Sequence, residues 1–475
     1  MTIVDENYLD ERLGQLENVA GWSPRTLSRF ETFIRGSEDY LLFKINPLEY
    51  AHDKHIKEKE ACDLFLHASR LGLFDIQWGL VCPMCGDTVE SFASLRKVDT
   101  HFHCNICEID TVATLDDFIM ISFVISPRVR SIVFHHPEQL SILDYWQHYR
   151  FNRQWRHKDG SSITSLFTTG LRALQGVAVG AQENISLELS SGFLKIFNLA
   201  EEKVFTLPIE ASSGAPSSTV LLNYEEGDTQ ASSPSVIEGQ VQLHITNNTA
   251  KVLPLAIAHV AAADLAKGFI IEPFFTAKQL LNSQTFRNLF SSEVILATEG
   301  IGIKDITLLF TDLKGSTAMY DRIGDLQAFS LVRQHFESLT KVISLNNGAI
   351  VKTIGDAVMA TFLTPLDGVN AALHMLREID DFNALRGSPD LVLKIGLHHG
   401  AAIAVTLNDR LDYFGQTVNI AARVQCLADE DEIYITKEIF DAEGVKRVLK
   451  DFEVLAEQSM LKGISEAVSV YKVRV

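Results

Sequence analysis

The sequence has no long apolar run, little positive charge and few cysteines. Its longest apolar stretches, such as FIMISFVI at 118–125, fall far short of the about 18 residues that a membrane span needs. The 61 Asp and Glu outnumber the 42 Lys and Arg, for a net charge of −19. This balance disfavours a general nucleic-acid binder, because phosphate contacts need clustered cations. The acidic N-terminus, MTIVDENYLDER, does not suit a secretory signal. These absences predict a cytoplasmic protein with no membrane span and no nucleic-acid partner.

Four of the six cysteines form two CxxC pairs, Cys82-Pro-Met-Cys85 and Cys104-Asn-Ile-Cys107, with 18 residues between them. Two such knuckles at this separation fit a tetrahedral four-thiolate Zn²⁺ site of structural type, as in zinc ribbons. The alternative, a redox CxxC, usually occurs singly in a βαβ context. His101 and His103 flank the second knuckle. We interpret them as bystanders, although the sequence leaves open whether either replaces a cysteine ligand.

At 475 residues the chain is too long for one core, and its length suggests about three domains. Apolar residues recur at helical spacing early in the chain, as in ACDLFLHASRLGLF, and later alternate at strand spacing. The Asn247-Asn248 pair within VQLHITNNTAKVLPL indicates a hairpin turn. The predicted multidomain organisation is a helical segment, interpretable as winged-helix-like, at 1–75; a zinc-ribbon-like module at 76–125; an all-β, sandwich-like regulatory region at 126–262; a helical linker at 263–300; and a C-terminal domain at 301–475.

Two aspartates in the C-terminal domain each end an apolar strand, 44 residues apart. Asp312 lies in FTDLKGST, where the N–H groups of residues 314–317 can face phosphate oxygens at the start of a helix. Alone, Asp312 could equally be the N-cap of that helix. Asp356 lies in the Gly-Asp turn of VKTIGDAVMA, and most such turns are only turns. As a pair, the two carboxylates suit a two-metal site.

A third motif, LDYFGQTVNIAARV at 411–424, places Asp412, Asn419 and Arg423 around the start of a helix. Together the three motifs resemble the catalytic domain of the class III nucleotidyl cyclases, over residues 306–472. The resemblance implies an α+β, ferredoxin-like cyclase domain at the C-terminus. It also implies that Asn419 and Arg423 position the ribose and stabilise the transition state. The preceding region is loosely similar to an uncharacterised N-terminal module of some bacterial cyclases.

The same resemblance implies a metal and phosphate subsite. Two Mg²⁺ or Mn²⁺ ions per active site would be held by Asp312, Asp356 and the backbone carbonyl of Leu313. Substrate phosphates would face the helix start, at Gly315, Ser316 and Thr317. Lys462 resembles the lysine that contacts the terminal phosphates, in surroundings that match less well.

By the resemblance, Lys352 and Asp412 read the purine base. Adenine offers an acceptor at N1 and a donor at its 6-amino group, which match a donating Lys352 and an accepting Asp412. Guanine presents the reverse pattern, and each buried mismatch costs about 1–3 kcal/mol. The predicted substrate is therefore ATP.

In this family the metal aspartates come from one catalytic domain and the purine and transition-state residues from its partner. This chain carries both sets, which predicts a homodimer with two equivalent sites. Residues 401–411 form a shorter hairpin segment than in the animal enzymes, so the strength of that dimer stays open. The leading hypothesis is an adenylate cyclase that converts ATP to 3′,5′-cyclic AMP and pyrophosphate, with a regulatory N-terminal half of unknown signal. The alternatives are a guanylate cyclase and a non-catalytic, nucleotide-binding zinc regulator.

Overall fold

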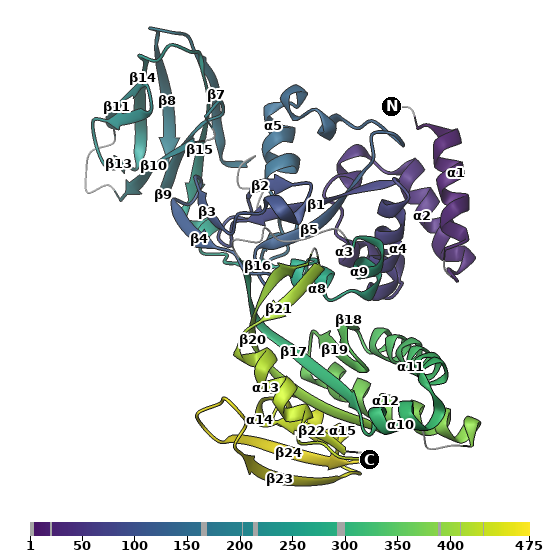
Figure 1. Ribbon diagram of the computed structural model, residues 1–475. Helices are drawn as coiled ribbons and strands as arrows, with labels where there is room; N and C mark the ends of the chain where they lie inside the picture. Colours follow the sequence, from purple (N-terminus) through teal and green to yellow (C-terminus); the bar gives the residue numbers. More distant parts are fainter. Residues whose placement is uncertain are drawn as a thin grey trace.

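The structure is a computed structural model that describes residues 4–19, 21–162, 169–201, 203–211, 217–291, 300–387, 391–408, 410–430 and 432–475. Figure 1 shows two halves joined at a narrow waist. The upper half contains the N-terminal helices, a small central sheet and a β-sandwich that projects to one side, and the lower half is the C-terminal domain. Among the helices of the described residues, none is long and apolar enough to cross a membrane. The protein is thus multidomain, with a large β-rich N-terminal region.

Four helices open the chain and share one apolar core. The side chains of Asp5, Ser23 and Asn46 cap the first three by accepting first-turn N–H groups. The fourth is the amphipathic helix expected from ACDLFLHASRLGLF, and the chain turns away from it at Gly72, whose φ of 84° favours glycine. The helices are α1 (Glu6–Glu17), α2 (Pro24–Gly36), α3 (Pro47–Lys54) and α4 (Glu58–Arg70).

A three-stranded antiparallel sheet, in the order β2-β1-β5, packs beside these helices, and a separate hairpin joins β3 to β4. All seven residues of β5 are buried, which explains the apolar run FIMISFVI as core rather than membrane. The strands are β1 (Phe74–Val81), β2 (Thr88–Phe92), β3 (His101–Cys104), β4 (Ile109–Val112) and β5 (Ile119–Ile125). Short helical turns follow: η3 (Val133–His135), η4 (Pro137–Gln139), α5 (Ile142–Asp144) and the π-helix η5 (Tyr145–Arg150).

Two sheets packed face to face form a β-sandwich around an apolar core. One sheet has the order β13-β10-β9-β15-β7 and the other β12-β11-β14-β8. The strands are β7 (Leu171–Val177), β8 (Gln182–Leu189), β9 (Gly192–Asn198), β10 (Lys203–Glu210), β11 (Ser217–Glu225), β12 (Asp228–Ala231), β13 (Val236–Ile237), β14 (Gly239–Asn247) and β15 (Leu253–Ala261).

The hairpin expected at Asn247-Asn248 is wrong. The flanking strands β14 and β15 belong to opposite sheets, so the chain crosses the sandwich there instead of turning back within one sheet. Asn247 is fully buried, and its amide donates to the carbonyls of Val177 (2.9 Å) and Lys251 (2.8 Å). Both strands have apolar inward faces, and crossing buries the two faces against each other.

The C-terminal domain is built on an eight-stranded sheet with the order β18-β19-β17-β20-β22-β24-β23, and β21 pairs with β20. Neighbouring residues of β17 point to opposite faces: Leu309 packs into a core with α11 and α12, whereas Leu308 and Phe310 join the core shared with the N-terminal helices. Its elements are β17 (Ile301–Leu313), α10 (Ser316–Ile323), α11 (Asp325–Leu345), β18 (Gly348–Ile354), β19 (Ala357–Phe362), α12 (Pro365–Arg386), β20 (Leu393–Leu407), β21 (Arg410–Phe414), α13 (Gln416–Gln425), β22 (Glu432–Thr436), α14 (Lys437–Phe440), α15 (Val445–Val448), β23 (Glu453–Ser459) and β24 (Val468–Arg474).

Two short helices, α8 (Ala277–Leu281) and α9 (Gln284–Leu289), form bonds with the C-terminal domain at the waist. The other short elements are α7 (Ala262–Leu265), which contacts the sandwich, and the paired strands β6 (Trp155–His157) and β16 (Phe269–Ile271). Lys278 on α8 forms ion pairs with Asp116 of the N-terminal half (2.7 Å) and Asp305 of β17 (2.6 Å). Gly302 accepts a backbone hydrogen bond from Leu115. The C-terminal domain therefore forms direct ion-pair and hydrogen-bond contacts with the N-terminal half.

Candidate functional site

The two aspartates predicted to bind metal lie at the same end of the sheet. Asp312 is near the end of β17, and Asp356 is in the turn between β18 and β19. Strands β17 and β19 are antiparallel neighbours, and Phe310 lies opposite Met359. Two residues further along in the same register, Asp312 lies opposite position 357, which directly follows Asp356. Burial, followed by the charge of Asp356, raises the pKa of Asp312. The structure thus brings the two carboxylates together.

These carboxylates have the features of a cation site. Oδ2 of Asp356 is buried and has no hydrogen-bond partner within the described part of the chain. A buried, unpaired carboxylate oxygen beside a second carboxylate is unfavourable without a positive charge. Hard oxygen donors are the ligands that Mg²⁺ and Mn²⁺ prefer. The residues present therefore fit the expected divalent metal, and the buried backbone of Leu313, at the end of β17, lies next to Asp312.

The expected phosphate-facing segment begins helix α10. Gly315 adopts a left-handed conformation (φ 70°) and precedes the first helical residue, Ser316; both Gly315 and Thr317 are exposed. Lys314 departs from the prediction, because its N–H donates to the carbonyl of Val392 (2.9 Å). The available backbone donors at this helix start are therefore residues 315–317.

Lys352 and Asp412 form an ion pair between two different strands. Lys352 Nζ lies 2.5 Å from Asp412 Oδ2, joining β18 to β21, although the residues are 60 positions apart in the sequence. Asp412 is buried and its Oδ1 accepts from the N–H of Tyr413 (2.8 Å), while the lysine side chain is about two-fifths exposed (39%). A register irregularity between Ile350 and Lys352 marks a bulge, and a bulge re-aims the neighbouring side chain. The predicted base-reading pair is thus assembled in one chain.

Asn419 and Arg423 lie on α13, four residues apart and both exposed. This spacing places them on the same helix face. The helix lies close against β20, where a Cβ on Gly396 would be 2.1 Å from the backbone nitrogen of Gln425. Lys462, predicted to contact phosphates, is exposed in the connection between β23 and β24.

One buried residue near the site was missed by sequence reasoning. His335 on α11 is fully buried, and neither of its ring nitrogens has a hydrogen-bond partner among the described residues. Burial lowers the pKa of His335 to about 4, while the charge of Asp356 acts in the opposite direction. The sequence around His335 is that of an ordinary amphipathic helix, so it does not indicate that this histidine lies near Asp356.

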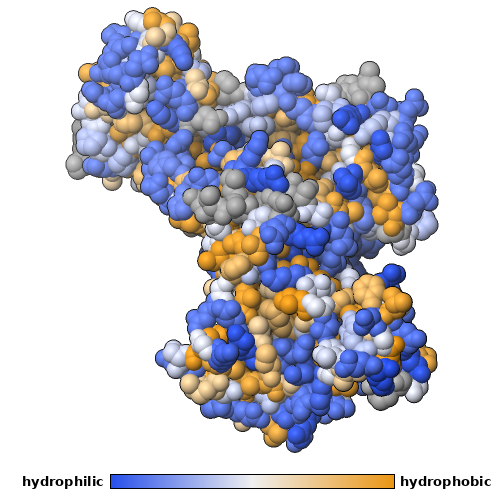
Figure 2. Space-filling view, viewed as in Figure 1, coloured by the Kyte–Doolittle hydropathy of each residue, from blue (hydrophilic) through white to orange (hydrophobic). Residues whose placement is uncertain are grey.

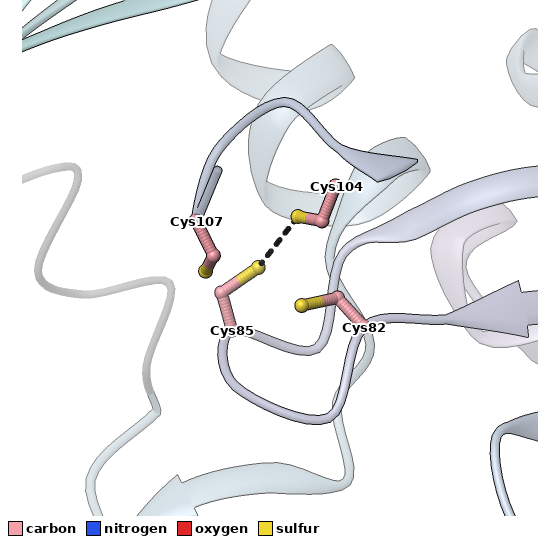
Figure 3. Close-up of side chains that lie close together, drawn as sticks. All are labelled: Cys82, Cys85, Cys104 and Cys107. Atoms are coloured by element: carbon pink, nitrogen blue, oxygen red, sulfur yellow. Dashed lines mark hydrogen bonds between the residues drawn. The ribbon is translucent and has the colours of Figure 1, made fainter. Parts of the chain in front are cut away.

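The four knuckle cysteines converge on one point, as Figure 3 shows. Their Sγ atoms all lie within 4.8 Å of one another, and Cys85 and Cys104 are 3.7 Å apart. This separation is too long for a disulfide and matches the about 3.8 Å edge expected for tetrahedral Zn–S bonds. Hydrogen bonds from Cys104, Cys107 and Cys85 lower the pKa of Cys82, and one from Cys107 lowers the pKa of Cys104 to about 7. The shared protons raise the pKa of Cys85 and Cys107. This cluster could bind a metal.

The surroundings of the cysteines tie three regions together. Asp87, just after the first knuckle, forms a buried bidentate ion pair with Arg150 (2.7 Å for both bonds). Lys195 of the sandwich strand β9 donates to the carbonyl of Ile106, inside the second knuckle (2.9 Å). His103 instead pairs with Asp110 at the surface. The partners of Asp87 and Ile106 lie 63 and 89 residues away, so local sequence does not identify them.

A family model described as a family of unknown function, DUF5939, matches residues 10–288, more than half of the chain. The chain belongs to the DUF5939 family. Downstream of the DUF5939 region, the model of the adenylate and guanylate cyclase catalytic domain matches residues 301–472. The C-terminal domain is therefore an adenylate/guanylate cyclase catalytic domain that follows a DUF5939 module.

Parts of this chain are similar to known proteins. An adenylate cyclase of Anabaena cylindrica is 30% identical over 192 residues, 36% of this chain and 36% of that protein. The uncharacterised protein Rv2212 of Mycobacterium tuberculosis is 29% identical over 247 residues, 51% of this DUF5939 chain and 59% of that protein. The chain thus spans less than two thirds of either relative. The crystal structure of the adenylyl cyclase CyaB from P. aeruginosa is 21% identical and covers 37% of this chain and 96% of its own, with a TM-score of 0.33.

Proposed function

We propose that this protein is an adenylate cyclase, which converts ATP to 3′,5′-cyclic AMP and pyrophosphate. The observation that carries the proposal is the ion pair between Lys352 and Asp412, held across two strands of a cyclase catalytic domain. The ammonium of Lys352 can donate to N1 of adenine and the carboxylate of Asp412 can accept from its 6-amino group, whereas guanine presents a donor to the ammonium and an acceptor to the carboxylate. The buried position of Asp412 makes such a mismatch costly.

The proposed reaction is attack by the ribose 3′-oxygen on the α-phosphorus. A bond forms between O3′ and the α-phosphorus, the bond to pyrophosphate breaks, and the hydroxyl proton passes to water. Divalent ions held by Asp312 and Asp356 would neutralise the triphosphate and activate the attacking oxygen. The remaining work of the chain is positioning and charge stabilisation: residues 315–317 face the phosphates, Arg423 faces the developing charge, and Asn419 orients the ribose.

The proposed active form is a homodimer through the cyclase domain. Asn419 and Arg423 are exposed in the single chain, with nothing from the same chain closing over them among the described residues. The nearby hairpin of β20 and β21 exposes the cross-strand pair Ile403 and Phe414, 46% and 49% exposed. Figure 2 shows hydrophobic surface gathered at the waist, over β21 and β16. An exposed apolar face beside exposed transition-state residues supports completion of the site by a second copy.

The proposed role of the cysteine cluster is structural Zn²⁺ binding within a zinc-ribbon-like module. Four thiolates complete a tetrahedral shell and leave no open position for substrate. The apolar residues around Cys82 and Cys104 include Trp146 of η5 and Phe197 of the sandwich. A metal here would therefore hold the knuckles against both neighbours.

The experiment that tests the function uses the full chain. The purified protein is incubated with ATP or GTP and Mg²⁺ or Mn²⁺, the cyclic product is identified by mass spectrometry, and Asp312→Ala serves as the inactive control. Cyclic AMP from ATP is the expected product. Cyclic GMP alone would transfer the assignment to a guanylate cyclase. Absence of both products, with nucleotide still bound, would favour the non-catalytic regulator.

A further inference from the structure

Helix α9 has two chemically different faces at the waist. Phe286 is buried in the N-terminal half, where its ring meets Trp78 of β1 edge to face (6.3 Å between centroids) and stacks with Phe290 (5.3 Å). Gln284 and Arg287 bond with the cyclase domain. Gln284 and Arg287 are three positions apart, which places them at neighbouring positions on one helical surface. The helix thus joins the DUF5939 core to the catalytic domain.

The polar face of α9 forms hydrogen bonds with two particular strands. Gln284 Oε1 accepts from the N–H of Ile350 on β18 (2.8 Å). Arg287 Nη1 donates to the carbonyl of Leu411 (3.4 Å) and Nη2 to the hydroxyl of Tyr413 (3.0 Å), both on β21. Arg287 Nε donates to the carbonyl of Leu281, which anchors the guanidinium to the connection from α8 (2.8 Å).

These two strands are the ones that carry Lys352 and Asp412. Gln284 binds β18 two residues before Lys352, at the start of the bulge. Arg287 binds the residues on either side of Asp412. In the described part of the chain, β18 is at the edge of its sheet and β21 pairs with β20 alone, so each has a side without a hydrogen-bonded neighbouring strand.

We infer that Gln284 and Arg287 are positioning residues that set the geometry of the Lys352–Asp412 pair, and that the DUF5939 module thereby controls base recognition. The inference rests on the proposed function. Recognition of a purine edge needs both groups at hydrogen-bonding distance and in the right direction. A shift of either strand separates the pair, so the side chains of α9 act on selectivity through Lys352 and Asp412 without touching substrate.

The chain offers a matched contrast in Lys278. This residue also joins the halves, through charged contacts to Asp305 of β17 and Asp116, but its hydrogen bonds and ion pairs among the described residues do not reach β18 or β21. Removing it weakens the attachment of the module without releasing the strands that carry the pair. If α9 only attached the module to the cyclase domain, variants of Lys278 and Arg287 would have the same effect on the preference for ATP over GTP.

The test compares Arg287→Lys, Gln284→Leu, Gln284→Glu and Lys278→Met in the full chain. The readout is kcat/KM for ATP divided by kcat/KM for GTP, because this ratio does not depend on the fraction of protein that is folded. Lysine keeps the charge but lacks the guanidinium fork that reaches several acceptors. We expect Arg287→Lys and Gln284→Leu each to lower the ratio about fivefold, the effect of one hydrogen bond, mainly through KM for ATP.

Gln284→Glu retains an acceptor for Ile350 and is expected to keep the wild-type ratio, as is Lys278→Met. The inference is overturned if Arg287→Lys and Gln284→Leu leave the ratio unchanged, or if Lys278→Met lowers it equally, while the wild type is active. If the wild type made no cyclic nucleotide from either substrate, the proposed function would be contradicted. The positioning role, which rests on that function, would then be contradicted as well.

Discussion

At the scale of single residues, the buried imidazole of His335 near the proposed site has a strongly lowered pKa. Its surroundings keep it neutral, because burial lowers its pKa to about 4 against an ordinary value of 6.5. The unfolded chain therefore takes up a proton as the pH falls below 6.5, whereas the folded chain does so only near 4. The resulting stability is complete above pH 6.5 and is lost progressively between 6.5 and 4.

Replacing His335 with leucine should flatten the acid side of the stability profile. From the pKa difference, the wild type should lose about 3 kcal/mol at this position between pH 6.5 and 4, and His335→Leu should lose none of it. The measurement is the thermal midpoint at several pH values in this window, with exposed His52→Leu as control. If the thermal midpoint of His335→Leu fell with pH as steeply as that of His52→Leu, His335 would not contribute to the pH dependence of stability.

From the sequence, the paired carboxylates could be proposed because each ends an apolar strand in a short motif, and the lysine–aspartate pair because its motifs resemble those of the cyclase family. His335, Gln284 and Arg287 could not be found in this way. Their relevance comes from contacts with residues 21, 66 and 124 positions away, and nothing in their immediate neighbours encodes those contacts.

At the scale of elements, the two knuckles connect the central sheet, η5 and the sandwich. Cys82 follows β1, Cys104 ends β3, and the apolar cluster around them extends to Phe197, Val204 and Ala256 of the sandwich. A metal bound here would reinforce a junction that the apolar cluster, the Asp87–Arg150 ion pair and the Lys195–Ile106 hydrogen bond also hold. Its loss should therefore be felt in the sandwich as well as in the knuckles.

Changing Cys82 or Cys104 to serine should remove the bound zinc and loosen this junction. We expect the zinc content to fall from about one ion per chain to near zero, with faster hydrogen exchange in β9 and β15. Elemental analysis and exchange mass spectrometry measure the two effects. Cys426→Ser, a change at an exposed lone cysteine, is the control. Full zinc content in Cys82→Ser would contradict the assignment.

Element-scale predictions succeeded where a periodic pattern coincided with burial, as in α4, and failed at Asn247-Asn248. A pair of asparagines between two alternating strands is typical of a hairpin. Sequence periodicity reports which face of a strand is apolar, but not which of two sheets the strand joins. The sandwich is closed by long-range pairing, of β14 with β8 and β15 with β9.

At the scale of the whole molecule, the proposed dimer divides each active site between two chains. Asp312 and Asp356 would serve one half of a site, and Asn419 and Arg423 the other half. Two variants with lesions in opposite halves should therefore repair each other when mixed, which no monomeric site can do.

Mixing inactive Asp312→Asn with inactive Arg423→Ala should restore activity. Half of the randomly paired dimers are mixed, and each mixed dimer has one intact site of two, so the expected recovery is about a quarter of the wild-type rate. Cyclic AMP formation after co-refolding or subunit exchange is the measurement. Recovery should depend on protein concentration, and a mixture no more active than its components would contradict a shared site.

The sequence by itself determined that the C-terminal domain resembles a cyclase catalytic domain, because the residue types that we propose for metal, phosphate and base recognition lie within short, self-contained motifs. It also determined the four-cysteine cluster, since the spacing of two knuckles limits their geometry. Only the tertiary structure decided how the DUF5939 module meets that domain. The bonds from α9 to β18 and β21 join segments distant in sequence, and the bonds to Ile350 and Leu411 use backbone groups rather than particular side chains. Such contacts leave no mark in the sequence pattern and become visible only once the chain is folded.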